Sequence, residues 1–129
     1  PMSSEAQQAA KAVDAFHAKL VSGDGVAAAA LLADDALIFE SGHAERSRAE
    51  YASRHAGADA AYAAAVSSRL TRRNGLVDGD TAWVVSESRA TGKYKDKPVD
   101  RVTTETMILR KTAEGWRIAH IHWSSRAAT

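Results

Sequence analysis

The clearest structural pattern in the chain is its C-terminal segment, Gly115-Trp116-Arg117-Ile118-Ala119-His120-Ile121-His122-Trp123-Ser124-Ser125-Arg126. It follows the turn-like sequence Thr112–Gly115 and is rich in strand-forming residues, so we predict a terminal β-strand. Alternate side chains of a strand share a face. One face is then apolar and carries Ala119, Ile121 and Trp123. The opposite face carries Ile118, His120, His122 and Ser124.

The two histidines of this second face suggest a functional site. A polar group on a partly buried face is costly unless it has a hydrogen-bond partner or a ligand. His120 and His122 would lie next to each other on that face, so we expect a functional site there.

Composition sets the broad class of the protein. The 129 residues fit one domain spanning 1–129, and 26% charged with 45% hydrophobic residues is typical of a globular chain. A net charge of +1 with scattered Lys and Arg argues against a nucleic-acid partner. The absence of cysteine excludes disulfides, thiolate catalysis and Cys-based zinc sites.

No apolar run approaches the roughly 20 residues that span a bilayer, so we expect no membrane partner. The start lacks the pattern of a signal peptide. We therefore expect a cytoplasmic protein, or a periplasmic one if an upstream signal peptide has been removed. Pro1 before Met2 is typical of tag removal, and residues 1–3 are expected to be such a remnant or a disordered start.

Helical patterns dominate the first half of the chain. Ser4–Gln7 matches a capping box, and an apolar stripe at helical spacing follows it: Ala6, Ala9, Ala10, Val13, Phe16 and Leu20. Gly23–Gly25 ends this helix, and Asp24 can cap a short second one from Ala27 to Leu32. A short strand is predicted over Ala36–Ser41.

A second capping box, Ser47–Glu50, predicts another helix that carries Tyr51 and His55 on one face. From Val66 the pattern changes to β. We predict three long strands before the terminal one, over Ser67–Val77, Thr81–Thr91 and Val99–Arg110. This order indicates an α+β fold with helices packed on one face of a curled sheet.

Two motifs then carry a family resemblance. Asp34-Asp35-Ala36-Leu37-Ile38-Phe39 after two helices, and the Gly-Trp-x-Ile-x-His-x-His-Trp-Ser ending, resemble the SnoaL-like members of the nuclear transport factor 2-like superfamily. The resemblance covers essentially the whole chain and extends to the association domain of calcium/calmodulin-dependent kinase II. It implies a cone with N-terminal helices on a curved, mainly antiparallel sheet, an enclosed pocket, and usually a homodimer formed through sheet surfaces.

This fold does not define one function. Relatives include a steroid isomerase, a scytalone dehydratase, polyketide cyclases, transport factors and oligomerisation hubs. The acidic base and the oxyanion pair of the isomerase have no counterpart that we can assign in this sequence, whereas the two cone histidines of the dehydratase are a closer chemical analogy.

Our leading hypothesis is a small organic ligand bound in a pocket lined by Glu40, His55, His120 and His122. One imidazole could remove a proton while the other, or Glu40, returns it, as in a dehydration, isomerisation or cyclisation. His120, His122 and Glu40 are therefore the catalytic candidates. The candidate ligand contacts are His55, Tyr51, Arg101 and Ser124, and Arg101 could bind a substrate carboxylate.

Two alternatives remain open. In the first, His120 and His122, about 6.6 Å apart along the strand, hold a divalent Zn or Cu ion with a third ligand from Glu40, His43 or His55. In the second, the cone is a non-catalytic dimerisation module. Two further charged groups receive structural interpretations: Glu105 is expected to pair with an arginine across the sheet, and His17 to be solvated.

Overall fold

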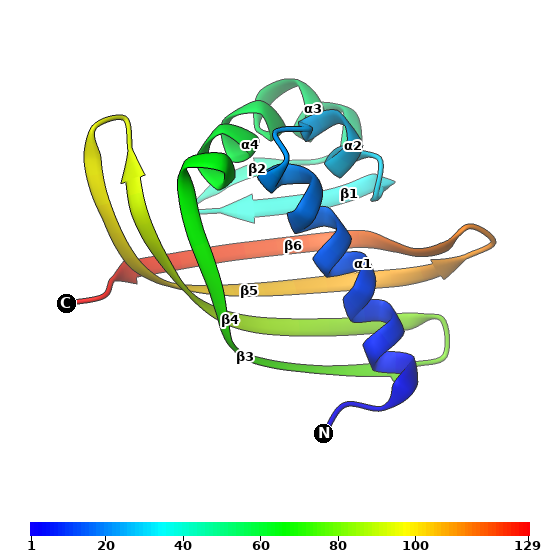
Figure 1. Cartoon of the computed structure of the whole chain (residues 1–129). Helices are drawn as coiled ribbons and strands as arrows, with labels where there is room; N and C mark the ends of the chain where they lie inside the picture. The colour runs from blue at the N-terminus through cyan, green and yellow to red at the C-terminus, as the bar shows by residue number, and fades with distance from the viewer.

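The computed structural model describes all residues from 1 to 129 and contains four helices and one six-stranded sheet (Figure 1). The helices are α1 (Ser4–Val21), α2 (Gly25–Ala29), α3 (Arg48–Arg54) and α4 (Ala56–Ala65). The strands are β1 (Leu32–Glu40), β2 (His43–Glu45), β3 (Val66–Asp78), β4 (Thr81–Tyr94), β5 (Lys97–Thr112) and β6 (Gly115–Ala127).

The sheet has the order β2-β1-β6-β5-β4-β3. Strands β3 to β6 form the predicted antiparallel meander, and β1 pairs with β6 in parallel. Helix α1 runs across the sheet, whereas α2, α3 and α4 gather at one end of it (Figure 1). The predicted α+β class, with N-terminal helices on a curved and mainly antiparallel sheet, is confirmed.

Helix α1 buries all six residues of the predicted apolar stripe. Its N-cap is Ser3 and not Ser4, because Ser3 has extended backbone angles and its hydroxyl accepts a hydrogen bond from the Ala6 amide. Met2, just before the cap, packs against the core. None of the four helices is both long enough and apolar enough to cross a membrane.

Pairing between strands shifts several predicted boundaries. Asp24 caps α2 as predicted, but the helix covers Gly25–Ala29 because Leu32 already pairs with Ile118 as the first residue of β1. Strands β4 and β5 also extend into residues 92–98, which separate the two predicted strands. The turn between them is reduced to Lys95 and Asp96, which both adopt positive φ.

A bulge in β6 changes which residues face the core. Ile118 pairs with Leu109 and His120 pairs with the preceding residue of β5, so Ala119 is an extra residue in the ladder. Ile118 and Ile121 are therefore both fully buried. The prediction that Ile118 shares a face with His120 is wrong, because simple alternation does not continue through a bulge.

The core lies between α1 and the concave face of the sheet. Val13 and Phe16 of α1 pack in one cluster with Ile38, Met107 and Ile121 from three adjacent strands. The opposite, outer face of the sheet carries exposed apolar side chains: Leu37, Phe39, Leu76, Trp83 and Ile108. The fold thus has an enclosed side and an open side.

Substitutions at two adjacent positions of β6 test this assignment of faces. Ile121→Ala should lower the free energy of unfolding by about 2–5 kcal/mol, because it opens a cavity in the core. His122→Ala should lower it by no more than about 1 kcal/mol, because His122 is exposed and loses only its edge-on contact with Phe39. Urea denaturation measures both values. Equal destabilisation by the two changes would contradict the assigned faces.

Candidate active site

A cavity of about 780 Å³ lies between α1, α4 and the concave face of the sheet. This volume is in the range that holds small organic ligands. Apolar side chains from several elements line it, among them Leu20, Tyr62, Val66, Ala90 and Trp123. Charged side chains line it as well, namely Asp14, His17, Glu40, Asp59, Arg73, Arg101 and Glu105.

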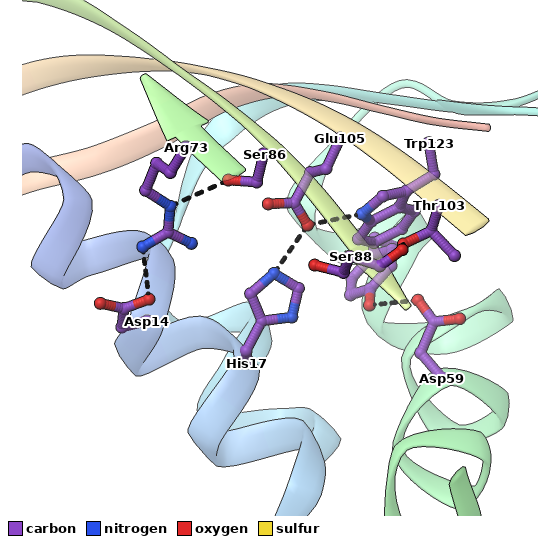
Figure 2. Close-up of polar contacts among 10 residues, drawn as sticks. Asp14, His17, Asp59, Arg73, Ser86, Ser88, Thr103, Glu105 and Trp123 are labelled. Carbon is purple, nitrogen blue, oxygen red and sulfur yellow. Dashed lines mark hydrogen bonds and ion pairs between the residues drawn. The ribbon is translucent and has the colours of Figure 1, made fainter. Parts of the chain in front are cut away.

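A histidine–carboxylate pair forms part of the cavity wall, and Figure 2 shows its contacts. His17 Nε2 lies 2.6 Å from Glu105 Oε2, and the Trp123 indole N–H donates to the same oxygen at 2.8 Å. Glu105 and Trp123 are direct partners in the β5–β6 ladder, so the strand register brings them together. Glu105 is only 8% exposed, whereas the His17 side chain keeps 43% of its surface accessible and lines the cavity.

Only one nitrogen of His17 is used by the protein. Nε2 faces Glu105, and Nδ1 has no hydrogen-bond partner. Figure 2 shows Nδ1 turned away from Glu105, toward the space between His17 and Asp59. With Nε2 occupied by the carboxylate, Nδ1 is the atom that can exchange a proton with a molecule in the cavity.

The two partners shift each other's pKa toward the charged pair. Burial alone would lower the pKa of His17, but the hydrogen bond and negative charge of Glu105 outweigh it, and the pKa is raised. Burial would likewise raise the pKa of Glu105, yet the contacts with His17 and Trp123 leave it lowered. The second oxygen of Glu105 is buried with no hydrogen-bond partner, which is a costly and rare arrangement in a folded protein.

Arg73 extends this polar wall along α1, one turn toward the N-terminus of the helix. Its Nε donates to the Ser86 hydroxyl at 2.9 Å, and one terminal nitrogen donates to Asp14 at 2.7 Å. The side chain is 13% exposed. Its positive charge lowers the pKa of both His17 and Glu105, so it favours the carboxylate of the pair and opposes the imidazolium.

A second histidine lies among three carboxylates near one end of the cavity. His55 Nδ1 is 2.5 Å from Glu45, and Nε2 is 3.1 Å from Glu40 and 2.9 Å from Asp59. Hydrogen bonds to Asp59 and Glu40 outweigh partial burial and raise the pKa of His55 to about 11. The buried Tyr51 hydroxyl donates to the other oxygen of Asp59 at 2.7 Å. Burial and then the charge of Asp59 raise the pKa of Tyr51.

The predicted site residues therefore separate into groups. Glu40, Arg101 and Ser124 line the cavity, and Tyr51 and His55 join Glu40 in the cluster just described. His43 shares a smaller polar cleft of about 380 Å³ with His55 and Glu40.

The predicted placement of His120 and His122 in the pocket is wrong. Both lie on the outer face of the sheet, where each ring packs edge-on against Phe39. His120 Nδ1 lies 2.8 Å from the Leu37 carbonyl oxygen. Ile121 is buried in the core and Trp123 lines the cavity, so the alternation of β6 places the two imidazoles on the opposite face.

The His-x-His pair consequently does not meet its predicted third ligands. The donor atoms that do converge belong to Glu40, His55 and Asp59, all within 4.8 Å of one another. A divalent ion there would have to displace the proton that His55 holds between its carboxylates. Metal binding stays a prediction, and these three residues are the ones that could hold an ion.

The pair of His17 and Glu105 was missed as a site, although the sequence contains a signal for it. His17 follows Val13 by four residues and precedes Leu20 by three, so it lies on the apolar stripe and not on the solvated face. Glu105 lies on the same strand face as Met107, which is buried. A histidine and an acid on two apolar faces that pack together are expected to pair.

Residues 9–128 match the family model of the SnoaL-like domain, and the chain belongs to this family. A protein from Shewanella frigidimarina NCIMB 400, provisionally named a ketosteroid isomerase, has a similar structure. It is 40% identical, with 91% of this chain and 94% of that chain covered and a TM-score of 0.86.

Two more distant structures share the fold. A provisionally named dehydratase of the nuclear transport factor 2-like family, from Streptomyces avermitilis, is 22% identical over 96% of this chain and 97% of that chain, with a TM-score of 0.81. The calcium/calmodulin-dependent protein kinase II hub of S. rosetta is 20% identical over 96% and 98%, with a TM-score of 0.76. No match to a curated protein was found.

The His55 cluster leads to a prediction about pH. Its folded-state pKa of about 11 lies above the ordinary 6.5, so the contribution of its ion pairs to stability is complete below about pH 6.5. That contribution is lost as the pH rises through about 11. His55→Gln should therefore cost about 1.5–3 kcal/mol near neutral or lower pH and much less at high pH. Urea denaturation across this range measures the difference, and a constant difference would contradict the raised pKa.

Proposed function

We propose that the protein binds a small organic molecule in the cavity and catalyses proton transfer on it, as a dehydratase, isomerase or cyclase does. The observation that carries this proposal is the His17–Glu105 pair on the cavity wall, with one imidazole nitrogen free. The provisional names of the two similar proteins, a ketosteroid isomerase and a dehydratase, support the same kind of chemistry.

His17 would act through Nδ1. In its neutral form, with the proton on Nε2 donated to Glu105, Nδ1 accepts a proton from the ligand, and the resulting imidazolium is stabilised by the buried carboxylate. In its protonated form the same nitrogen donates. Glu105 is a positioning residue, since it selects the tautomer and orients the ring, and the Trp123 indole holds Glu105 in turn.

A second proton-transfer group would complete a dehydration or isomerisation. Glu40 keeps its predicted role here, because it lines the cavity and is oriented by His55 at 3.1 Å. Ser124 also lines the cavity and is proposed as a hydroxyl contact for the ligand. His120 and His122 have no part in this proposal, because both lie on the outer face.

Proton exchange tests the proposed role of His17 without knowledge of the natural substrate. Carbonyl compounds that bind the protein should exchange acidic C–H protons in D₂O, and His17→Gln should slow this exchange by about 10²–10⁴-fold. NMR signal loss follows the rate. In parallel, Glu105→Gln should bring the pKa of His17 below 6.5, because burial then acts without the carboxylate.

Glu87→Gln provides the matched control, since it makes the same change on the exposed outer face of β4. This variant should leave both the exchange rate and the pKa of His17 as they are in the unchanged protein. Unchanged exchange in His17→Gln would exclude His17 as the catalytic base or acid.

We also propose that two copies of the chain associate through the outer face of the sheet. The exposed apolar side chains Phe39, Trp83 and Ile108 lie together there, and Trp83 and Ile108 are paired across β4 and β5. The similarity to a kinase hub supports self-association. A non-catalytic dimerisation module is the second candidate function, and it would use the same face without chemistry in the cavity.

Charge placed on this face tests the association. The combined change Trp83→Glu and Ile108→Glu should convert a dimer into a monomer in sedimentation equilibrium, because buried unpaired charges are costly. Val26→Glu, at a residue of α2 that is 81% exposed, introduces charge away from the sheet and should leave the dimer intact. A monomer before any substitution would contradict the proposal.

A further inference from the structure

Arg101 is a cation of the cavity without a carboxylate partner. Its side chain lines the cavity, and its one side-chain hydrogen bond runs from Nε to the neutral Ser125 hydroxyl at 2.9 Å. The other arginine of the wall, Arg73, is held by Asp14. The remaining donors of the Arg101 guanidinium are therefore free for a ligand, and they have the fork geometry that matches a carboxylate.

The β4–β5 hairpin extends beyond Arg101 and has a net positive charge at its end. This end carries Lys93, Lys95 and Lys97 with one acid, Asp96, and Figure 1 shows the hairpin rising beside α4. The acid nearest in sequence, Asp100, is held by Arg89 at 2.7 Å.

The rings of Tyr62 and Tyr94 bridge α4 and β4 near Arg101, with centroids 5.2 Å apart and an edge-on arrangement. Both line the cavity, so they offer aromatic surface beside a cation. Burial raises the pKa of Tyr62, and the charge of Arg101 opposes this rise, which means that the two side chains lie within electrostatic reach of each other.

We infer that the ligand is a small organic acid, with its carboxylate on Arg101 and its reacting end at His17. This inference rests on the proposed function of His17 and adds the substrate class. Arg101 and Glu105 lie on one face of β5, four residues apart, which is about 13 Å of strand. The side chains of Arg101 and Glu105 both extend into the cavity and shorten this distance. A ligand with one or two flat rings between its carboxylate and its reacting carbon then spans what remains.

Two probes that differ only in charge test the inference. 2-Naphthoate should bind at least about tenfold more tightly than 2-naphthamide, as measured by calorimetry, because only the acid can form a charge-assisted contact with Arg101. Arg101→Gln should remove this preference and leave the affinity for the amide within about twofold.

Arg126→Gln is the matched control. Arg126 lies on the outer face of β6 opposite Val102, and it donates to the Ala127 carbonyl oxygen, so this change removes the same charge close by but outside the cavity. The preference for naphthoate should persist in this variant. Circular dichroism confirms that both variants are folded.

The possible outcomes separate this inference from the proposed function. Equal binding of acid and amide, or equal loss of the preference in Arg101→Gln and Arg126→Gln, would overturn the assignment of an organic acid and leave the cavity function standing. Competition by millimolar inorganic phosphate as strong as that by naphthoate would also overturn it, in favour of a phosphate ligand. Failure of both naphthalene probes to bind would overturn the inference together with the proposed ligand cavity.

Discussion

A buried carboxylate on the concave face of the sheet organises this molecule. Glu105 extends from a strand face that otherwise carries buried apolar residues, and leaving it unpaired would cost several kcal/mol. It is paired by groups from two other elements, the His17 imidazole of α1 and the Trp123 indole of β6. The polar requirement of one side chain thus ties α1 and β6 to β5 beside the apolar packing of α1. Because helix and strand are both rigid, the imidazole is held in one orientation at the cavity wall.

The two histidine–carboxylate clusters differ in whether the histidine can exchange a proton with a ligand. His55 uses both ring nitrogens on three carboxylates, and its pKa of about 11 keeps it protonated throughout the neutral range. An imidazole in that state has no lone pair to accept a proton. His17 uses one nitrogen on one carboxylate and leaves the other toward the cavity. The number of carboxylates around each ring therefore decides which histidine can take part in proton transfer.

The fold was largely predictable from the sequence, because periodicity reports directly on burial. The apolar stripe of α1 extends over several helical turns, and the alternation in β4 and β5 extends over several residue pairs. A few residues that break such a long pattern do not change the predicted type of element. The site was less predictable. The His-x-His motif was assigned to the pocket because the polar face opposite Ile121 and Trp123 was taken as the pocket lining, whereas the core and the cavity share the face that carries these two residues. His17 was predictable from its place between Val13 and Leu20, yet its partner is 88 residues away and only packing reveals the pair.

The distribution of charge along the cavity would also determine how an anion lies in it. Glu40 and Asp59 line the wall near His55, where three carboxylates surround a single imidazolium. At an effective dielectric constant of about 20, two unit charges interact by about 4 kcal/mol at 4 Å and by less than about 2 kcal/mol at 10 Å. Direct contact with Arg101 would therefore supply the affinity, whereas repulsion from the distant carboxylates would only select the orientation. An anion bound in the reverse direction would lose the contact with Arg101 and would be repelled at short range by the carboxylates around His55. The cavity therefore favours one direction of binding.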